Sequence, residues 1–171
     1  MPYTLDDLAN DIRSHLNEKA VADCAPDICA LVSKVLVDDD FRSKHLPDRA
    51  EGVHPREVLY EDPDLGFCIC GHVYEGEAIG GPHDHGQSWA IYGQAEGTTE
   101  MTDWRIVDAG GADKPILVEP ETTYTMASGD AHFYDVGAVH SPTRTTTTRL
   151  IRIEGKNLDH VTRSNIAAAQ A

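Results

Sequence analysis

The feature that most constrains the fold is a change in residue pattern at about Glu57. Downstream of this residue, short stretches rich in β-branched and aromatic residues alternate with segments that contain glycine and proline. This pattern is typical of an all-β barrel or sandwich. We expect strands at residues 57–60, 67–74, 88–95, 98–107, 115–118, 122–127, 131–135 and 146–153. The expected turns are Asp62-Pro63-Asp64, Gly80-Gly81-Pro82, Gly110-Gly111, Ser128-Gly129-Asp130 and Ser141-Pro142.

Two helices are predicted before the β region. Residues 4–18 have an amphipathic pattern that Thr4 can cap. Pro26 suits the first turn of a second helix, whose apolar stripe runs to the acidic residues 38–40, which we interpret as a solvated helix end. The chain is therefore expected to consist of a helical segment at 1–50 packed on the barrel, a barrel at 51–160, and a C-terminal tail at 161–171 that frays from Ile166.

Length and charge limit the possible partners. A chain of 171 residues suits one domain, and its 40% hydrophobic content is ordinary for a globular protein. The formal net charge of −15 disfavours nucleic acids and anionic membranes. No apolar run is long enough to span a bilayer, and the N-terminus lacks the pattern of a secretion signal. We expect a cytoplasmic protein, and the sequence leaves its oligomeric state open.

The four cysteines are interpreted as reduced. Cys68 and Cys70 lie two apart in an apolar strand and point to one face, where small hydrophobic side chains pack well. Cys24 and Cys29 have no usual zinc spacing. Four cysteines without disulfides fit a reducing compartment.

Histidines at two places in the β region suggest a metal site. His83 and His85 are separated by one residue, so on a strand both imidazoles would point toward one ion. Downstream, Gly129 and Gly137 allow tight turns that can return a strand carrying His140 beside the first pair. The three histidines are the predicted metal ligands.

These two segments together resemble the two motifs of the cupin superfamily. The match comprises Gly80 or Gly81, His83, His85 and Gly97, followed by Gly129, Gly137 and His140. The resemblance implies a double-stranded β-helix, or jelly-roll barrel, with the metal in its mouth. The chain departs from the common pattern because Trp89 and Ala90 stand where a glutamate often follows the second histidine, and Asp135 replaces a proline.

Residues 56–158 also resemble the cysteine and mercaptopropionate dioxygenases, which are thiol dioxygenases. The similar features are the stretch from Leu59 to Phe67, the spacing from Phe67 to His83, and the closing segment 153–157. The resemblance implies iron(II) and dioxygen. It also aligns Arg56, with a shift of one residue, to an arginine that binds the substrate carboxylate.

The rest of that family's active site is not matched. Its serine, histidine and tyrosine relay aligns with Leu150, Arg152 and Glu154, and the cysteine that some members crosslink aligns with Ala90. Arg152 and Glu154 alternate so that both point to one side of a strand. Three alternatives are open for this pair. The two side chains form an ion pair with each other, or Arg152 is an anion clamp and Glu154 a general base, or both face solvent near a strand end.

His132 and four pocket candidates complete the predicted site. His132 lies eight residues before His140 and is a fourth ligand, a proton shuttle or a hydrogen-bonded structural histidine. Gln87, Trp89, Tyr92 and Tyr134 are candidates to line the pocket and orient substrate or dioxygen, although aromatic residues in a small barrel also serve as core. The other histidines are interpreted as surface or packing residues: His15, His45, His54, His72 and His160.

Three function classes follow. The first is a mononuclear iron(II) dioxygenase acting on a small polar or carboxylate-containing molecule, with a thiol among the candidates, because three neutral ligands leave open positions on the metal. The second is a lyase, isomerase or hydrolase that uses zinc, nickel or manganese as a Lewis acid, with Glu154 or His132 moving the proton. The third is a non-catalytic small-molecule sensor.

Overall fold

The computed structural model describes residues 3–50 and 52–169. The helices are α1 (Leu5–Glu18), α2 (Val21–Leu36) and α3 (Asp39–His45), and a single 3₁₀ turn covers Leu158–His160. The strands are β1 (Arg56–Glu61), β2 (Cys68–Tyr74), β3 (Ala78–Ile79), β4 (Ala90–Glu96), β5 (Thr99–Asp108), β6 (Ile116–Met126), β7 (Ala131–Tyr134), β8 (Val139–Arg144), β9 (Thr148–Glu154) and β10 (Ile166–Ala168). No helix in the described ranges has the length and apolar character needed to cross a bilayer.

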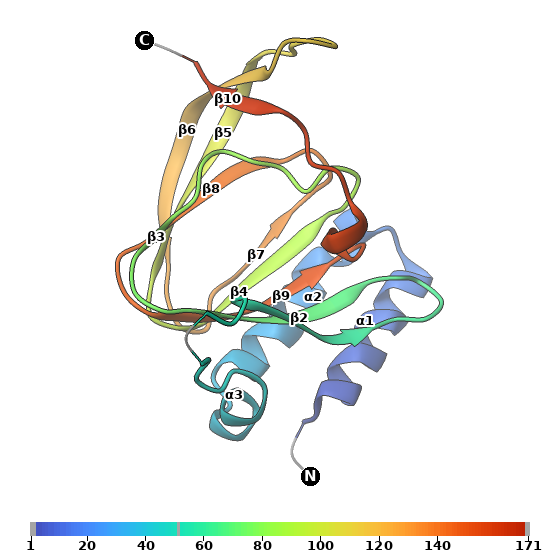
Figure 1. The fold of residues 1–171 in the computed structure, drawn as a ribbon. Helices are drawn as coiled ribbons and strands as arrows, with labels where there is room; N and C mark the ends of the chain where they lie inside the picture. Colours follow the sequence, from blue (N-terminus) through green and yellow to red (C-terminus); the bar gives the residue numbers. More distant parts are fainter. Residues whose placement is uncertain (1–2, 51, 170–171) are drawn as a thin grey trace.

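The strands form two facing five-stranded sheets. The helix-side sheet has the order β1-β2-β9-β4-β7, and the outer sheet has the order β10-β6-β5-β8-β3. Figure 1 shows α1 and α2 on the outer face of the helix-side sheet, with β5, β6 and β10 on the far side of the barrel from them. The predicted all-β double-stranded β-helix preceded by two helices is confirmed, with α3 as an additional helix.

Helix α1 begins where the sequence predicts it. The backbone N–H of Asp7 donates to Thr4 Oγ1 over 3.2 Å, and the Asp7 carboxylate accepts from the Thr4 backbone over 2.9 Å. This reciprocal capping box satisfies backbone donors that have no partner inside the helix. The apolar face of the helix buries Leu8, Ala9 and Ile12.

The predicted start of the second helix is wrong, and the acidic run at its end, where Asp39 and Asp40 are exposed as expected, also begins helix α3. Helix α2 begins at Val21, so Pro26 lies inside it rather than in its first turn. Cys24, Ala25 and Ile28 are buried around the proline, and this packing offsets the backbone hydrogen bond that proline cannot make. Asp38 caps α3, because its Oδ1 accepts from the backbone N–H of Phe41 over 2.9 Å.

Three predictions in the β region also need correction. The expected strands 115–118 and 122–127 form one strand, β6, which continues past Pro120 because bulges in its pairing with β5 absorb the irregularity. The expected turn at Ser141-Pro142 lies inside β8. The tail from Ile166 does not fray over its first residues: Ile166–Ala168 pair in parallel with Ile116–Val118 of β6.

The main apolar core lies outside the barrel, between α1, α2 and the helix-side sheet. Gly93 of β4 allows close contact here, since a Cβ at this position would lie 2.5 Å from Val32 Cγ1. Alternate residues of the same strands point into the barrel, where a smaller apolar cluster lies beside buried polar groups such as His85, His140 and Arg152. The packing therefore leaves the barrel interior available for a polar site.

Candidate metal centre

His83, His85 and His140 come together in the folded chain. One ligand nitrogen from each lies within 4.8 Å of the others. His140 belongs to β8, whereas His83 and His85 lie in the loop between β3 and β4. Two backbone hydrogen bonds of 3.0 Å between His83 and His140 join the loop to the strand. The predicted triad therefore assembles, although the His-x-His segment is a bridged loop instead of a continuous strand.

Free nitrogen atoms make this group suitable for a metal ion. His83 Nδ1 lies 2.9 Å from the carbonyl oxygen of Gly81, which can only accept, so Nδ1 carries the proton and Nε2 keeps its lone pair. His85 Nδ1 and both ring nitrogens of His140 are buried without a hydrogen-bond partner. Buried nitrogens without partners are costly unless a ligand satisfies them. The residues therefore fit a divalent metal bound by imidazole.

The protonation state of the triad also suits a metal. Burial lowers the pKa of His83, His85 and His140, and neighbouring imidazoles lower the pKa of His85 and His140 further. Arg152 and Arg163 act in the same direction on all three groups. The histidines are therefore neutral near pH 7, which is the form that binds metal ions.

The C-terminal segment 161–168, which we call the C-terminal strap, fixes the His-x-His loop. Asp84 Oδ1 accepts from the backbone N–H groups of Gly86 and Ser164, each over 3.0 Å, and Asp84 Oδ2 accepts from Ser164 Oγ over 2.5 Å. Gly86 has φ +56°, and a Cβ there would lie 2.3 Å from the carbonyl oxygen of Thr162. The strap is therefore part of the structure that positions the triad.

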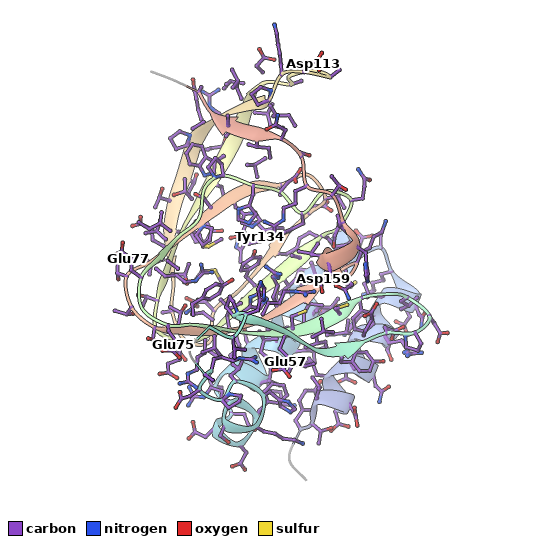
Figure 2. All side chains as sticks on the ribbon, in the orientation of Figure 1. Glu57, Glu75, Glu77, Asp113, Tyr134 and Asp159 are labelled. Atoms are coloured by element: carbon purple, nitrogen blue, oxygen red, sulfur yellow. The ribbon has the colours of Figure 1, made fainter. Side chains whose placement is uncertain are left out.

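Two aromatic residues predicted for the pocket lie against the triad. The Tyr134 ring stacks on His140 with 4.0 Å between centroids, and Figure 2 shows Tyr134 between the two sheets. The Tyr134 hydroxyl lies 2.5 Å from that of Tyr124. The Tyr92 hydroxyl lies 3.1 Å from His85 Nε2 and accepts from Arg152 Nη1 over 3.2 Å. Tyr92 thus connects the histidines to a second polar network.

That second network contains Arg56, Arg152 and Glu154. Arg56 donates to both carboxylate oxygens of Glu154 over 3.0 and 2.8 Å, and Arg152 Nε donates to Oε1 over 2.9 Å. The backbone N–H of Leu158 also donates to Glu154, whose side chain is fully buried. Of the three alternatives for Arg152 and Glu154, the structure shows a buried ion pair facing the barrel interior, so the solvent-facing alternative is wrong.

The ion pairs leave Glu154 poorly suited to act as a general base and Arg56 poorly suited to bind a substrate carboxylate. Burial alone raises the pKa of Glu154, but the hydrogen bonds from Arg56 and the charge of Arg152 outweigh burial and lower it overall. A carboxylate in this environment is a weak base. Arg56 also pairs with Asp159 over 2.8 Å, so its guanidinium is occupied by two carboxylates of the protein.

The remaining predicted site residues lie away from the triad nitrogens. His132 packs between Tyr124 and Tyr134 with its ring tilted to both, at centroid distances of 5.1 and 4.6 Å, and the three-histidine group does not include it. Gln87 is exposed in the turn before β4. Trp89 packs with the helix-side core and against Gly155. Neither Gln87 nor Trp89 therefore lines the cavity beside the triad.

That cavity has a volume of about 460 Å³ and reaches His83, Tyr92 and Arg152. Its lining also includes Arg144 and Arg163, which the sequence interpretation missed. The sequence does contain a pattern that could have identified Arg144. It lies four residues after His140, and residues i, i+2 and i+4 of a strand share one face. The mistaken turn at Ser141-Pro142 obscured this alternation.

Comparisons with known proteins identify similar folds only. No family model matches the chain, and no curated protein gives a significant sequence match. Among solved structures, the cupin domain of Schizosaccharomyces pombe Cnp3 is 13% identical with a TM-score of 0.44, covering 60% of this chain and 64% of that one. KdgF from Halomonas sp. is 14% identical with a TM-score of 0.47, covering 67% of this chain and 93% of that one.

A third similar structure is an uncharacterized conserved Klebsiella pneumoniae protein with a double-stranded β-helix domain. It is 11% identical with a TM-score of 0.49, covering 72% of this chain and 87% of that one. Similarities of this size carry no information on activity. The description of this chain rests on its own two five-stranded sheets and on its group of three histidines. The protein is a double-stranded β-helix preceded by helices, and its three-histidine group is able to hold a metal ion.

Proposed function

We propose that this protein is a mononuclear metalloenzyme in which His83, His85 and His140 bind iron(II) for a reaction of dioxygen with a small polar molecule, a carboxylate or a thiol. The observation that carries the proposal is the set of unpartnered nitrogens on the buried, neutral histidines. None of the three ligands is a carboxylate. Bound iron(II) would supply the redox chemistry, with positions left open for the two reactants.

The chain's own residues then have positioning roles. Gly81 fixes the tautomer of His83, and the Tyr134 ring restricts the orientation of His140 by stacking. The Tyr92 hydroxyl lies at the cavity wall beside His85, where it can orient a bound molecule by a hydrogen bond. Arg152 and Glu154 hold Tyr92 through the buried ion pair.

The alternative, a lyase, isomerase or hydrolase that does not use dioxygen, needs a group that moves a proton. Glu154 is poorly suited because two arginines occupy both of its oxygens. His132 is the other candidate, and its pKa is lowered by burial. Its ring lies beside Tyr124 and Tyr134 and is not part of the cavity lining. These observations favour the dioxygenase proposal.

The test begins with metal content. The protein is purified without added metal and then loaded anaerobically with iron(II) or zinc, and bound metal is measured by mass spectrometry. His83→Ala, His85→Ala and His140→Ala should each lose most of the bound metal. His160→Ala is the matched control because His160 is exposed and lies outside the triad. Full metal content in all three triad variants would overturn the site.

Oxygen consumption then separates the two classes of reaction. The iron-loaded protein is assayed against a panel of thiols and small carboxylates, and we expect one dioxygen consumed per molecule of substrate. The zinc-loaded protein should be inactive. Turnover of the same substrate under anaerobic conditions, or with zinc alone, would reject the dioxygenase proposal in favour of the alternative.

A further inference from the structure

The charge of the cavity beside His83 is opposite to that of the whole chain. The chain carries 29 acidic and 14 basic residues. The cavity lining nevertheless includes Arg144, Arg152 and Arg163, and no carboxylate is present among the lining residues that the structure describes. A concave surface lined by one sign of charge concentrates ligands of the opposite sign. The electrostatic preference of this cavity is for an anion.

The three arginines differ in how far the protein already uses them. Arg152 is committed to Glu154 and Tyr92. Arg163 belongs to the C-terminal strap and is exposed at the cavity. Arg144 is 4% exposed, and its Nε is buried without a hydrogen-bond partner. Over residues 3–50 and 52–169, no ion pair includes Arg144.

Keeping Arg144 unpaired in this position is costly. A buried cation without an anionic partner loses hydration that nothing in the protein replaces. Its guanidinium lies over the Tyr74 ring, 4.2 Å from the centroid, which fixes its orientation and compensates only part of that loss. Burial lowers the pKa of Arg144, and so does the nearby charge of Arg152. A ligand that supplies negative charge would relieve this cost.

Arg144 lies on β8, the same strand that carries the candidate metal ligand His140. His140, Pro142 and Arg144 alternate along β8, and Pro142 and Arg144 both line the cavity. At about 3.3 Å per residue, four residues place the Cα atoms of His140 and Arg144 roughly 13 Å apart. His83 of the triad and Arg144 line the same cavity, so a small molecule of a few carbon atoms can extend from the triad toward the guanidinium.

From these observations we propose that the cavity binds a small organic carboxylate and that Arg144 is the residue that holds its carboxylate group. The inference rests on the proposed function, because it names the substrate class of the same site. It assigns the clamp to Arg144 in place of Arg56, whose guanidinium is occupied by Glu154 and Asp159. The planar guanidinium matches a carboxylate through two parallel hydrogen bonds.

A carboxylate is favoured over a phosphate ester by what surrounds the cavity. Phosphate sites often use the N-terminus of a helix or a cluster of backbone N–H groups. Helices α1 and α2 lie on the opposite face of the helix-side sheet (Figure 1). Within the described residues, the only side chains that bring positive charge to the cavity are the three arginines, and Arg152 is already paired. Inorganic phosphate is therefore a useful competitor in the test.

The test compares charged ligands with neutral ligands of the same shape. Acetate, malonate, succinate and glutarate are titrated into the full chain by calorimetry, beside acetamide, malonamide, succinamide and glutaramide, with inorganic phosphate as a further ligand. At least one carboxylate should bind at least tenfold more tightly than its amide and more tightly than phosphate. If every amide matches its carboxylate, or if phosphate binds most tightly, the inference is overturned, and this comparison needs no variant.

Variants then assign the binding to Arg144. Arg144→Met should weaken the preferred carboxylate by about 10–100-fold, and Arg144→Lys, which keeps the charge without the planar fork, should give an intermediate loss. Arg105→Met is the matched control, since Arg105 pairs with Glu119 at the exposed surface of the outer sheet. Circular dichroism verifies folding of each variant. Unchanged affinity in a folded Arg144→Met variant would overturn the assignment.

The outcome is separable from that of the proposed function because the titrations are made with metal-free and metal-loaded protein. Binding that depends on Arg144 in both forms supports the inference even if no dioxygen is consumed. Dioxygen consumption that survives in Arg144→Met with an unchanged KM, and with no preference for carboxylates, would support the proposed function while rejecting the inference.

Discussion

The three arginines in and beside the barrel interior differ in whether the protein supplies them with an anionic partner. Arg56 and Arg152 share the carboxylate of Glu154, and the backbone of Leu158 completes the network. Arg144 faces the cavity without an anionic partner among the described residues. The charges of Arg56 and Arg152 are paired within the protein, whereas the charge of Arg144 has no such partner among the described residues. Stability and binding should therefore depend on different arginines.

The largest expected effect comes from Glu154→Gln. The substitution keeps the shape of the side chain but leaves two buried guanidinium groups without their common carboxylate. Removing one partner of a buried ion pair typically costs about 3–5 kcal/mol in the free energy of unfolding. Urea denaturation followed by circular dichroism measures the loss.

The matched control for this variant is Glu119→Gln. Glu119 pairs with Arg105 over 2.6 Å, but both side chains are about half exposed. An exposed pair of this kind contributes only about 0–1 kcal/mol. Equal losses in the two variants would contradict the structural role assigned to the buried network.

A smaller effect is expected when acid titrates the same carboxylate. Its folded-state pKa lies below the usual value of 4.5. As pH falls, the unfolded chain protonates Glu154 before the folded chain does, so the contribution to stability is complete above the usual pKa and is lost below it. Denaturation from pH 7 to 3 should show the wild type approaching Glu154→Gln in stability. Two parallel curves would be inconsistent with the lowered pKa.

The first helix of this fold was predictable from local features, but the start of α2 and the strands that contain proline were not. Thr4 and the apolar spacing after it are local signals, so α1 was predicted correctly. Pro142 resembled a turn residue, yet it lies in β8 beside β3, which is only two residues long. Proline is tolerated near sheet edges and at bulges. Pro120 similarly divided β6 in the prediction, although the strand continues through a bulge.

The metal ligands of the candidate site were predictable from the sequence, but the ion pairs around them were not. His83, His85 and His140 follow from short spacings and glycine positions. The pairing of Arg56 with Glu154 depends on β2, which lies between β1 and β9 and aligns residues nearly a hundred positions apart. The arrangement of charges inside the barrel is thus a long-range property, and no local pattern contains it.

A change at Tyr92 sharpens the comparison because its hydroxyl lies between the ion-pair network and the triad. Tyr92→Phe removes the contacts with Arg152 and His85 while keeping the ring stacked on His85. A lost hydrogen bond of this kind costs about 1 kcal/mol. Denaturation should show that loss, and metal content should remain that of the wild type. A metal-free Tyr92→Phe variant would show that the tyrosine is needed to assemble the triad.

The smallest expected change in stability, and the clearest contrast with Glu154→Gln, is that of Arg144→Met. Methionine has a similar length and fills the same space, so the variant removes a buried charge without leaving a large cavity. Removing the desolvation cost of an unpaired cation stabilises the folded variant, and losing the contact of the guanidinium with the Tyr74 ring destabilises it.

These two terms oppose each other, so the free energy of unfolding should stay within about 1 kcal/mol of the wild type or increase. Arg152→Met should be clearly less stable, because Glu154 then retains only one of its two arginines. Parallel urea denaturation of the two variants measures the difference directly. If Arg144→Met were destabilised as strongly as Arg152→Met, Arg144 would be part of the folding energetics, and its lack of a partner would no longer indicate a charge reserved for a ligand.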